Sequence, residues 1–136
     1  MKKLWTSREI DASADTLWHL FTDLDAWATW GPSVRAAELD NDTFERGATG
    51  TVTTVAGLKL GFEVTGFSEG SFWAWNVAGV PSTHHKVEAL GEDRCRVGFG
   101  VPWLVAPYLA VCDIALRRLD TMATTTMATT KTGATQ

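Results

Sequence analysis

Apolar residues in the segment 13–32 recur at the spacing of an amphipathic helix. The stripe at i, i+3, i+4 and i+7 consists of Leu17, Leu20, Phe21 and Leu24. Ser13 stands just before the first turn, where its side chain can cap a backbone N–H that has no helical partner. A second short helix is expected to carry Trp27 and Trp30, and the following Gly-Pro pair should end it because proline cannot continue a helix. We therefore predict two short helices in this segment.

Segments of strand length occupy most of the remaining chain and are separated by turn residues. One of them, Leu4–Asp11, precedes the helices. Six follow the helices: Val34–Leu39, Thr49–Val55, Lys59–Phe67, Ser71–Val77, Ser82–Leu90 and Arg94–Val101. Most connections are short enough for hairpins, which predicts antiparallel pairing between successive segments.

A second amphipathic stripe predicts a long C-terminal helix. Pro107 fits its first position, where the missing N–H is tolerated, and apolar residues recur at helical spacing from Leu109 to Ala123. The Thr-rich residues 124–136 have no periodicity, and we expect them to form a frayed or disordered tail. A single domain over residues 1–123, followed by this tail, is the predicted organisation.

The order of these elements indicates an α+β fold. The apolar face of the sheet must be covered, and the C-terminal helix is the only long amphipathic element in the pattern. We predict a seven-stranded, curved antiparallel sheet wrapped around the long C-terminal helix, with two short helices between the first and second strands.

The connections at the two ends of this predicted sheet differ in composition. Successive hairpin loops alternate between the ends, so the polar turns 40–42, 68–70 and 91–93 fall on one end. The connections 56–58, 78–81 and 103–107 fall on the other and are almost wholly apolar. Apolar loops gathered at one end indicate the mouth of a hydrophobic cavity or a contact surface. The alternative is that these loops fold inward and complete the core.

Strand alternation proposes which side chains face the cavity. His85 is the titratable side chain that alternation places inside, where it is a candidate acid/base, although a core histidine satisfied by a neighbour is the favoured interpretation. The strand 71–77 leaves open which of its two faces is the inner one, so Trp75 and Asn76 are both candidates. The full set of candidate ligand-binding residues is His85, Asn76, Trp27, Trp30, Phe62, Trp75, Val80, Phe99, Trp103, Tyr108 and Cys112.

Composition and charge narrow the function. The net charge of −4, with acids and bases interspersed, argues against binding to nucleic acid or to an anionic membrane. We expect neither a signal peptide nor a membrane span, because no apolar run is long enough for either. Cys95 and Cys112 both look buried and are predicted to be reduced, which favours a cytoplasmic location. The three histidines lack metal-ligand spacing, so we predict no metal and no cofactor.

Several stretches resemble the START-like (SRPBCC) superfamily, in its polyketide cyclase/dehydrase and lipid transport branch. They read IDASADTLWHLFTDLDAWATWGP, GATGTVTTVAG, FEVTGFSEGSFWAWNV and HKVEALGEDRCRV, within roughly residues 4–122. The resemblance implies the helix-grip fold, with a cavity between the sheet and the C-terminal helix. Members of the superfamily include lipid and steroid carriers, plant hormone and allergen-type binders, aromatase/cyclases and chaperone co-activators, so the resemblance implies a pocket rather than its contents.

The predicted function is binding of a small, largely apolar ligand, lipid-, sterol- or polyketide-like, in that cavity. One alternative is an enzyme of the polyketide cyclase/dehydratase type using His85, although the expected inner surface is poor in the polar groups that such cyclases use. The other alternative is a protein-interaction module that uses the apolar loop end, in which charged substitutions at Val80 or Leu104 would abolish binding. The expected partner is a small hydrophobic molecule, without nucleic acid, and the chain is expected to be a monomer or a homodimer.

Overall fold

The computed structural model describes residues 3–135, except for the side chains of Leu104 and of residues 126–135. The strands are β1 (Lys3–Ile10), β2 (Val34–Leu39), β3 (Thr49–Thr54), β4 (Lys59–Ser68), β5 (Phe72–Val77), β6 (Val80–Gly91) and β7 (Arg94–Pro102). The α-helices are α1 (Ala14–Thr22), α2 (Trp27–Trp30) and α3 (Leu109–Thr135), and two 3₁₀ segments are η1 (Leu24–Ala26) and η2 (Trp103–Tyr108). No helix among the described residues is both long enough and apolar enough to cross a membrane.

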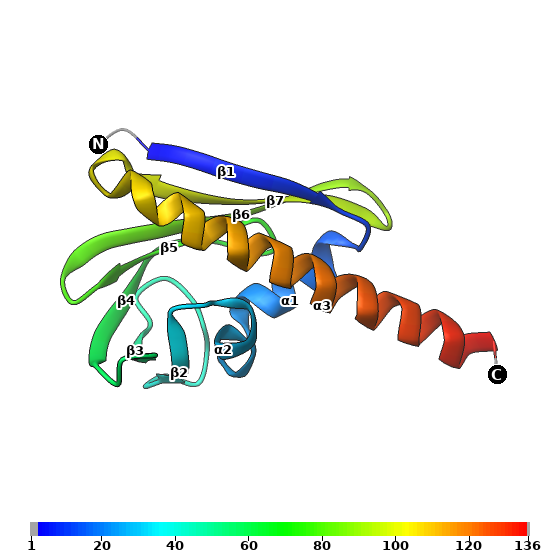
Figure 1. Cartoon of the computed structure of the whole chain (residues 1–136). Helices are drawn as coiled ribbons and strands as arrows, with labels where there is room; N and C mark the ends of the chain where they lie inside the picture. The colour runs from blue at the N-terminus through cyan, green and yellow to red at the C-terminus, as the bar shows by residue number, and fades with distance from the viewer. Residues whose placement is uncertain (1–2, 136) are drawn as a thin grey trace.

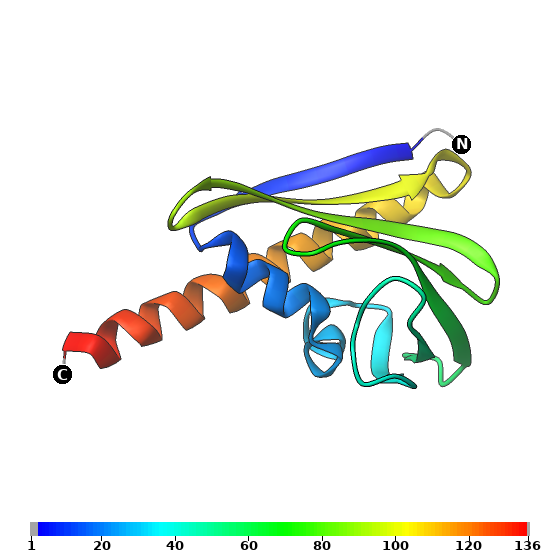
Figure 2. The same ribbon diagram turned by 180° about the vertical axis from the view of Figure 1, so that it is seen from behind.

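The strands form one antiparallel sheet with the order β1-β7-β6-β5-β4-β3-β2. Strands β2 to β7 are joined in sequence, whereas β1 is carried to the far edge and pairs with β7. The helix α3 runs across one face of this curved sheet, with α1 and α2 beside it (Figure 1). The view from behind shows the long hairpin of β6 and β7 arching over these helices (Figure 2). The predicted helix-grip architecture is confirmed.

A register shift in β4 changes which residues of that strand face the core. Phe62 and Val64 point inward, as alternation predicts, and are 4% and 0% exposed. Between Val64 and Gly66 the pairing with β5 shifts by one residue, so the inward position passes to Phe67, whose ring packs against other core rings. Bulges of this kind also bend a strand, which helps the sheet to curve around α3.

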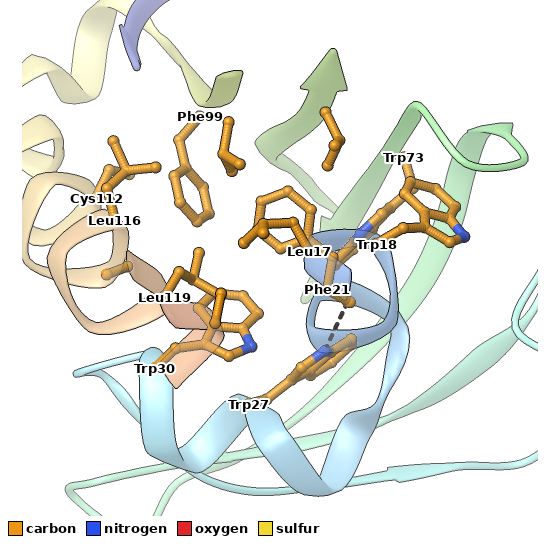
Figure 3. Close-up of a cluster of buried hydrophobic side chains, with 14 of the residues drawn as sticks. Leu17, Trp18, Phe21, Trp27, Trp30, Trp73, Phe99, Cys112, Leu116 and Leu119 are labelled. Carbon is orange, nitrogen blue, oxygen red and sulfur yellow. Dashed lines mark hydrogen bonds between the residues drawn. The ribbon is translucent and has the colours of Figure 1, made fainter. Parts of the chain in front are cut away.

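The two short helices are held together by indole hydrogen bonds. Ser13 caps α1 as predicted, because its side chain accepts a hydrogen bond from the Thr16 backbone N–H. Trp27 Nε1 donates to the carbonyl of Phe21 at 2.9 Å, and Trp30 Nε1 donates to that of Leu20 at 2.8 Å. Figure 3 shows the first of these bonds as a dashed line, between α1 and α2. The tryptophans therefore bury large apolar rings while satisfying backbone carbonyls at the end of α1.

The core joins the short helices to α3 and to the sheet. In Figure 3 the side chains of α1 and α2 lie opposite Cys112, Leu116 and Leu119 of α3, with Phe99 of β7 between them. The three α3 residues are at most 2% exposed. Burying an aliphatic side chain of this size contributes about 1.5–3 kcal/mol, so the α3 stripe is a main attachment of the helix to the sheet.

The final helix begins later than the sequence indicates. Pro107 lies inside η2 rather than at the first position of the long helix, which starts at Leu109. The backbone of Val105 (φ −115°, ψ 35°) is not helical, so the chain turns at that point before α3 begins. The predicted domain end at residue 123 lies within α3, and the side chains of the predicted tail from residue 126 onward lie outside the described part, so the frayed tail stays a prediction.

Candidate functional site

A cavity of about 40 Å³ lies between α2, the inner face of the sheet and α3. The segment at the end of α2 supplies Trp27, Trp30, Gly31, Pro32, Ser33 and Val34. The sheet supplies Trp73, Trp75, Thr83, His85 and Phe99. The C-terminal part supplies Tyr108, Val111, Cys112 and Ala115. The wall is therefore mainly aromatic and apolar, with a few polar atoms.

Most of the predicted ligand-binding residues line this cavity. Those that do are Trp27, Trp30, Trp75, His85, Phe99, Tyr108 and Cys112. Phe62 is buried but lies behind the wall, with its ring against those of Trp27 and Trp75. Val80 and Trp103 are 62% and 53% exposed at the loop end of the sheet and do not border the cavity.

The candidate Asn76 is on the wrong face of its strand. Trp73 and Trp75 point toward the core, where their rings pack against Trp27. Because side chains alternate along a strand, Asn76 points the other way and is absent from the cavity wall. The structure thus resolves the choice that the sequence left open for the strand 71–77, in favour of the tryptophans.

Sequence reasoning missed part of the wall. Thr83 shares its face of β6 with His85 and is 6% exposed, so the same alternation argument would have found it. Val111 and Ala115 lie on the same side of α3 as Cys112, and helical spacing could have indicated them. The segment after α2 carries no sequence signal for a cavity, because only its packing against α3 brings it there.

The polar atoms of the wall form a directed chain of hydrogen bonds. His85 Nδ1 lies 3.1 Å from the carbonyl oxygen of Trp73, which can only accept, so Nδ1 carries the proton. The second ring nitrogen, Nε2, is therefore an acceptor, and the Thr83 hydroxyl donates to it at 3.1 Å. The same hydroxyl accepts a bond from Trp75 Nε1 at 2.9 Å. Both ring nitrogens of His85 are thus occupied by protein groups.

His85 is also enclosed by rings. It is 2% exposed and stacks on Trp73, with ring centroids 3.6 Å apart and an interplanar angle of 10°. Phe21 and Phe99 meet it edge to face. This burial lowers the pKa of His85 to about 3, so the imidazole is neutral over the physiological range. The geometry favours the interpretation of His85 as a satisfied core histidine over that of a general base.

Trp73 has a buried donor without a partner. Its indole Nε1 is buried and forms no hydrogen bond within the described part of the chain. Leaving such a donor unpaired costs roughly 1–3 kcal/mol, and most buried donors in folded proteins are paired. Trp73 belongs to the cavity wall, but its Nε1 itself is covered by protein atoms.

A pair of hydroxyl groups closes the cavity toward the loop end. Ser33 Oγ and the Tyr108 hydroxyl form a hydrogen bond of 3.0 Å, and burial raises the pKa of Tyr108. Outside this pair lies an apolar groove of about 250 Å³ between the β5–β6 turn and η2, lined in part by Val80 and Val105. Thr83 and Tyr108 border both the cavity and the groove, so the two spaces are neighbours.

The site offers little other chemistry. The two cysteines are free and buried, as the sequence predicted, and burial raises the pKa of Cys95 to about 11 and that of Cys112 to about 12. Across the residues whose side chains are described, no three His, Cys, Asp or Glu groups are clustered so as to hold a metal ion.

A curved sheet that grips a long helix over an apolar cavity defines a helix-grip protein. The chain belongs to the family described as polyketide cyclase / dehydrase and lipid transport, whose model matches residues 1–129. No curated protein matches its sequence.

Solved structures share the fold at low sequence identity. The protein XoxI from Bacillus cereus superposes with a TM-score of 0.71 at 15% identity, over 90% of this chain and 96% of that one. The di-domain aromatase/cyclase BexL from the BE-7585A biosynthetic pathway gives 0.68 at 12% identity, over 88% of this chain and 45% of that one. Norcoclaurine synthase from Thalictrum flavum, in complex with dopamine and hydroxybenzaldehyde, gives 0.56 at 17% identity, over 87% and 85%.

Proposed function

We propose that the protein binds a small, largely apolar ligand, with one end in the inner cavity and its body in the outer groove. The observation that carries this proposal is the apolar cavity, which is bordered by a polar chain and lies beside the groove, with Thr83 and Tyr108 lining both. Membership of a family that includes cyclases and lipid carriers supports it.

The volumes limit the kind of ligand. Pockets for small molecules commonly enclose about 300–1,000 Å³. The cavity of about 40 Å³ admits only a small group, but together with the groove of about 250 Å³ it approaches the lower end of that range. A compact ring compound of the polyketide type therefore fits better than a sterol or a long acyl chain.

Fluorescence of the tryptophans tests this proposal. Four of them border the cavity, so a bound ligand should change their emission. In titrations with an aromatic polyketide, a flavonoid, a fatty acid and a sterol, the change should appear at lower concentrations of the ring compounds of polyketide type than of the others. Val111→Phe would fill the space beside α3. It should lower the affinity measured from the change in emission at least tenfold. The matched control is Ile114→Phe on the outer face of the same helix, where the side chain is 42% exposed, and it should leave the response unchanged. A response that is absent for all four compounds would overturn the proposal.

A cyclase or dehydratase that uses His85 has less support. Both nitrogens of the ring are engaged, and a pKa of about 3 makes a weak base at neutral pH. Turnover of an aromatic polyketide that disappears in His85→Ala and is retained in the folded control His84→Ala would reverse this ranking. The expectation of a cytoplasmic location stays part of the proposal, supported by two buried free thiols.

A further inference from the structure

Apolar side chains are concentrated at one end of the molecule. The exposed ones there are Val55, Leu58, Val80, Trp103 and Val105, each between 48% and 63% exposed. They come from the β3–β4 turn, the first residue of β6 and η2. A single exposed apolar residue is ordinary, whereas a group of this size at one end of a chain marks a contact surface. We call these five residues the apolar tips.

Hydrogen bonds through Ser33 link the β3–β4 turn to η2, and a shared groove links η2 to the start of β6. The backbone N–H of Val55 donates to the carbonyl of Ser33, and Ser33 in turn bonds Tyr108 at the end of η2. Val80 and Val105 border the same groove. In both Figure 1 and Figure 2 the start of β1 and η2 lie at the end of the molecule remote from the C-terminus of α3. The apolar tips therefore belong to one surface.

Charge is distributed unevenly around this surface. The sequence of residues 31–35, 55–60, 77–83 and 101–109 contains no Asp or Glu. Basic residues border it, since Lys3 pairs with Pro102 beside η2, Lys59 opens β4, and Arg35 is the second residue of β2. The acidic turns 40–42 and 91–93 lie at the opposite end of the sheet. The net charge of −4, which by itself argues against binding to an anionic membrane, does not reveal this local asymmetry.

We propose that the apolar tips dock on the surface of a lipid bilayer that contains anionic headgroups. Separate tips on different loops can each enter a deformable apolar layer, whereas a rigid partner would need a matching recess for every tip. Trp103 has the amphipathic ring that is enriched at bilayer interfaces, and the basic border matches anionic headgroups. The docked orientation turns the groove, and with it the mouth of the cavity, toward the lipid.

Binding to vesicles tests the proposal. The full chain should sediment with vesicles of phosphatidylcholine containing about one quarter phosphatidylglycerol, and more weakly with phosphatidylcholine alone. Leu58→Glu and Val105→Glu should each lower the partition coefficient about tenfold, because a charge replaces a side chain that would be buried in the lipid. Leu90→Glu is the matched control, since Leu90 is 38% exposed on β6 near the opposite end of the sheet, and it should bind like the original chain.

The charge border has its own pair of variants. Lys59→Glu should lower binding to the anionic vesicles about fivefold or more while changing binding to phosphatidylcholine much less. Arg46→Glu reverses a charge in the loop before β3, at the end of the sheet opposite the apolar tips. It should have little effect on binding to the anionic vesicles. All these side chains are exposed, so the melting temperatures should stay within a few degrees of that of the original chain.

Three results would overturn the proposal. The first is no binding to either vesicle at low salt, and the second is an equal loss in Leu58→Glu and Leu90→Glu. The third is concentration-dependent self-association that Leu58→Glu abolishes, which would make the surface a homodimer interface. The docking step does not require an occupied cavity, so vesicle binding by Val111→Phe would be retained even if ligand binding fails. Conversely, Leu58→Glu should keep the fluorescence response to a ligand.

Discussion

Acidification should destabilise this protein through His85. The ring is buried, and desolvation lowers its pKa from 6.5 to about 3, with a smaller lowering from His84 and an opposing contribution from the bond to the Trp73 carbonyl. The unfolded chain binds a proton near pH 6.5, whereas the folded chain stays neutral down to about pH 3. The unfolded state therefore holds more protons between these values, and stability falls as the pH falls through this window.

The size of the effect follows from the two pKa values. Within the window, the free energy of unfolding changes by up to about 1.4 kcal/mol per pH unit for one group. Between pH 7.5 and about pH 5 the loss should reach about 2 kcal/mol, a sizeable part of the ~5–15 kcal/mol that stabilises a typical domain. The contribution is fully present above pH 6.5, where both states hold a neutral ring.

Urea unfolding at a series of pH values measures this effect. His85→Gln should unfold more easily than the original chain at pH 7.5 but should lose much less stability on acidification, because the titrating group is gone. His84→Gln is the control, since His84 is only partly buried and its pKa is lowered by burial and by Lys3, so most of the slope should remain. Parallel slopes for the original chain and His85→Gln, or a ring resonance of His85 that titrates near pH 6.5, would refute the reasoning.

Three further predictions concern packing and reactivity. Thr83→Val keeps the side-chain shape but leaves His85 Nε2 without a donor, and denaturant unfolding should show a loss of about 1–3 kcal/mol; no loss would contradict the hydrogen-bond chain. Gly50→Ala places a Cβ against the backbone of β2 and an aromatic ring, so it should cost about 1–3 kcal/mol or more, whereas Gly61→Ala meets no atom closer than 4.0 Å and should be tolerated better. The two buried cysteines, with pKa values of about 11 and 12, should react with a thiol reagent only after unfolding, and rapid modification of the native chain would disprove their burial.

Much of the fold could be predicted because its signals are local. The cap at Ser13 and the stripe from Leu17 to Phe21 need only the residues of one helix, and both are present in α1. Leu24, the predicted end of the stripe, lies in η1 instead. The strand Val34–Leu39 has the predicted bounds, because turn residues on both sides interrupt it. The prediction for Pro107 was wrong because a proline fits the first turn of an α-helix and of a 3₁₀ helix equally well. The non-helical backbone at Val105 places Pro107 in η2, and that turn depends on packing against the sheet.

The candidate site was predictable only where one strand or helix decided it. Alternation correctly brought His85 and Phe99 to the inner face. The choice between Trp75 and Asn76 needed the neighbouring elements, because both faces of β5 carry large or polar side chains that could have been buried. The bulge in β4 falls at Gly66, and a glycine inside a strand pattern is a signal for a bulge that the alternation argument did not use.

The sequence by itself determined the order of elements, their antiparallel connection and the apolar character of both the cavity wall and the loop end. Periodicity and composition carry that information, because each depends on neighbours along the chain. Only the tertiary structure decided how much space remains between the rings and that His85 has both nitrogens occupied. Those properties depend on distances between side chains that are far apart in sequence. The cavity volume is also a small difference between the large volumes of the fold and of the side chains packed in it, and no local pattern encodes such a difference.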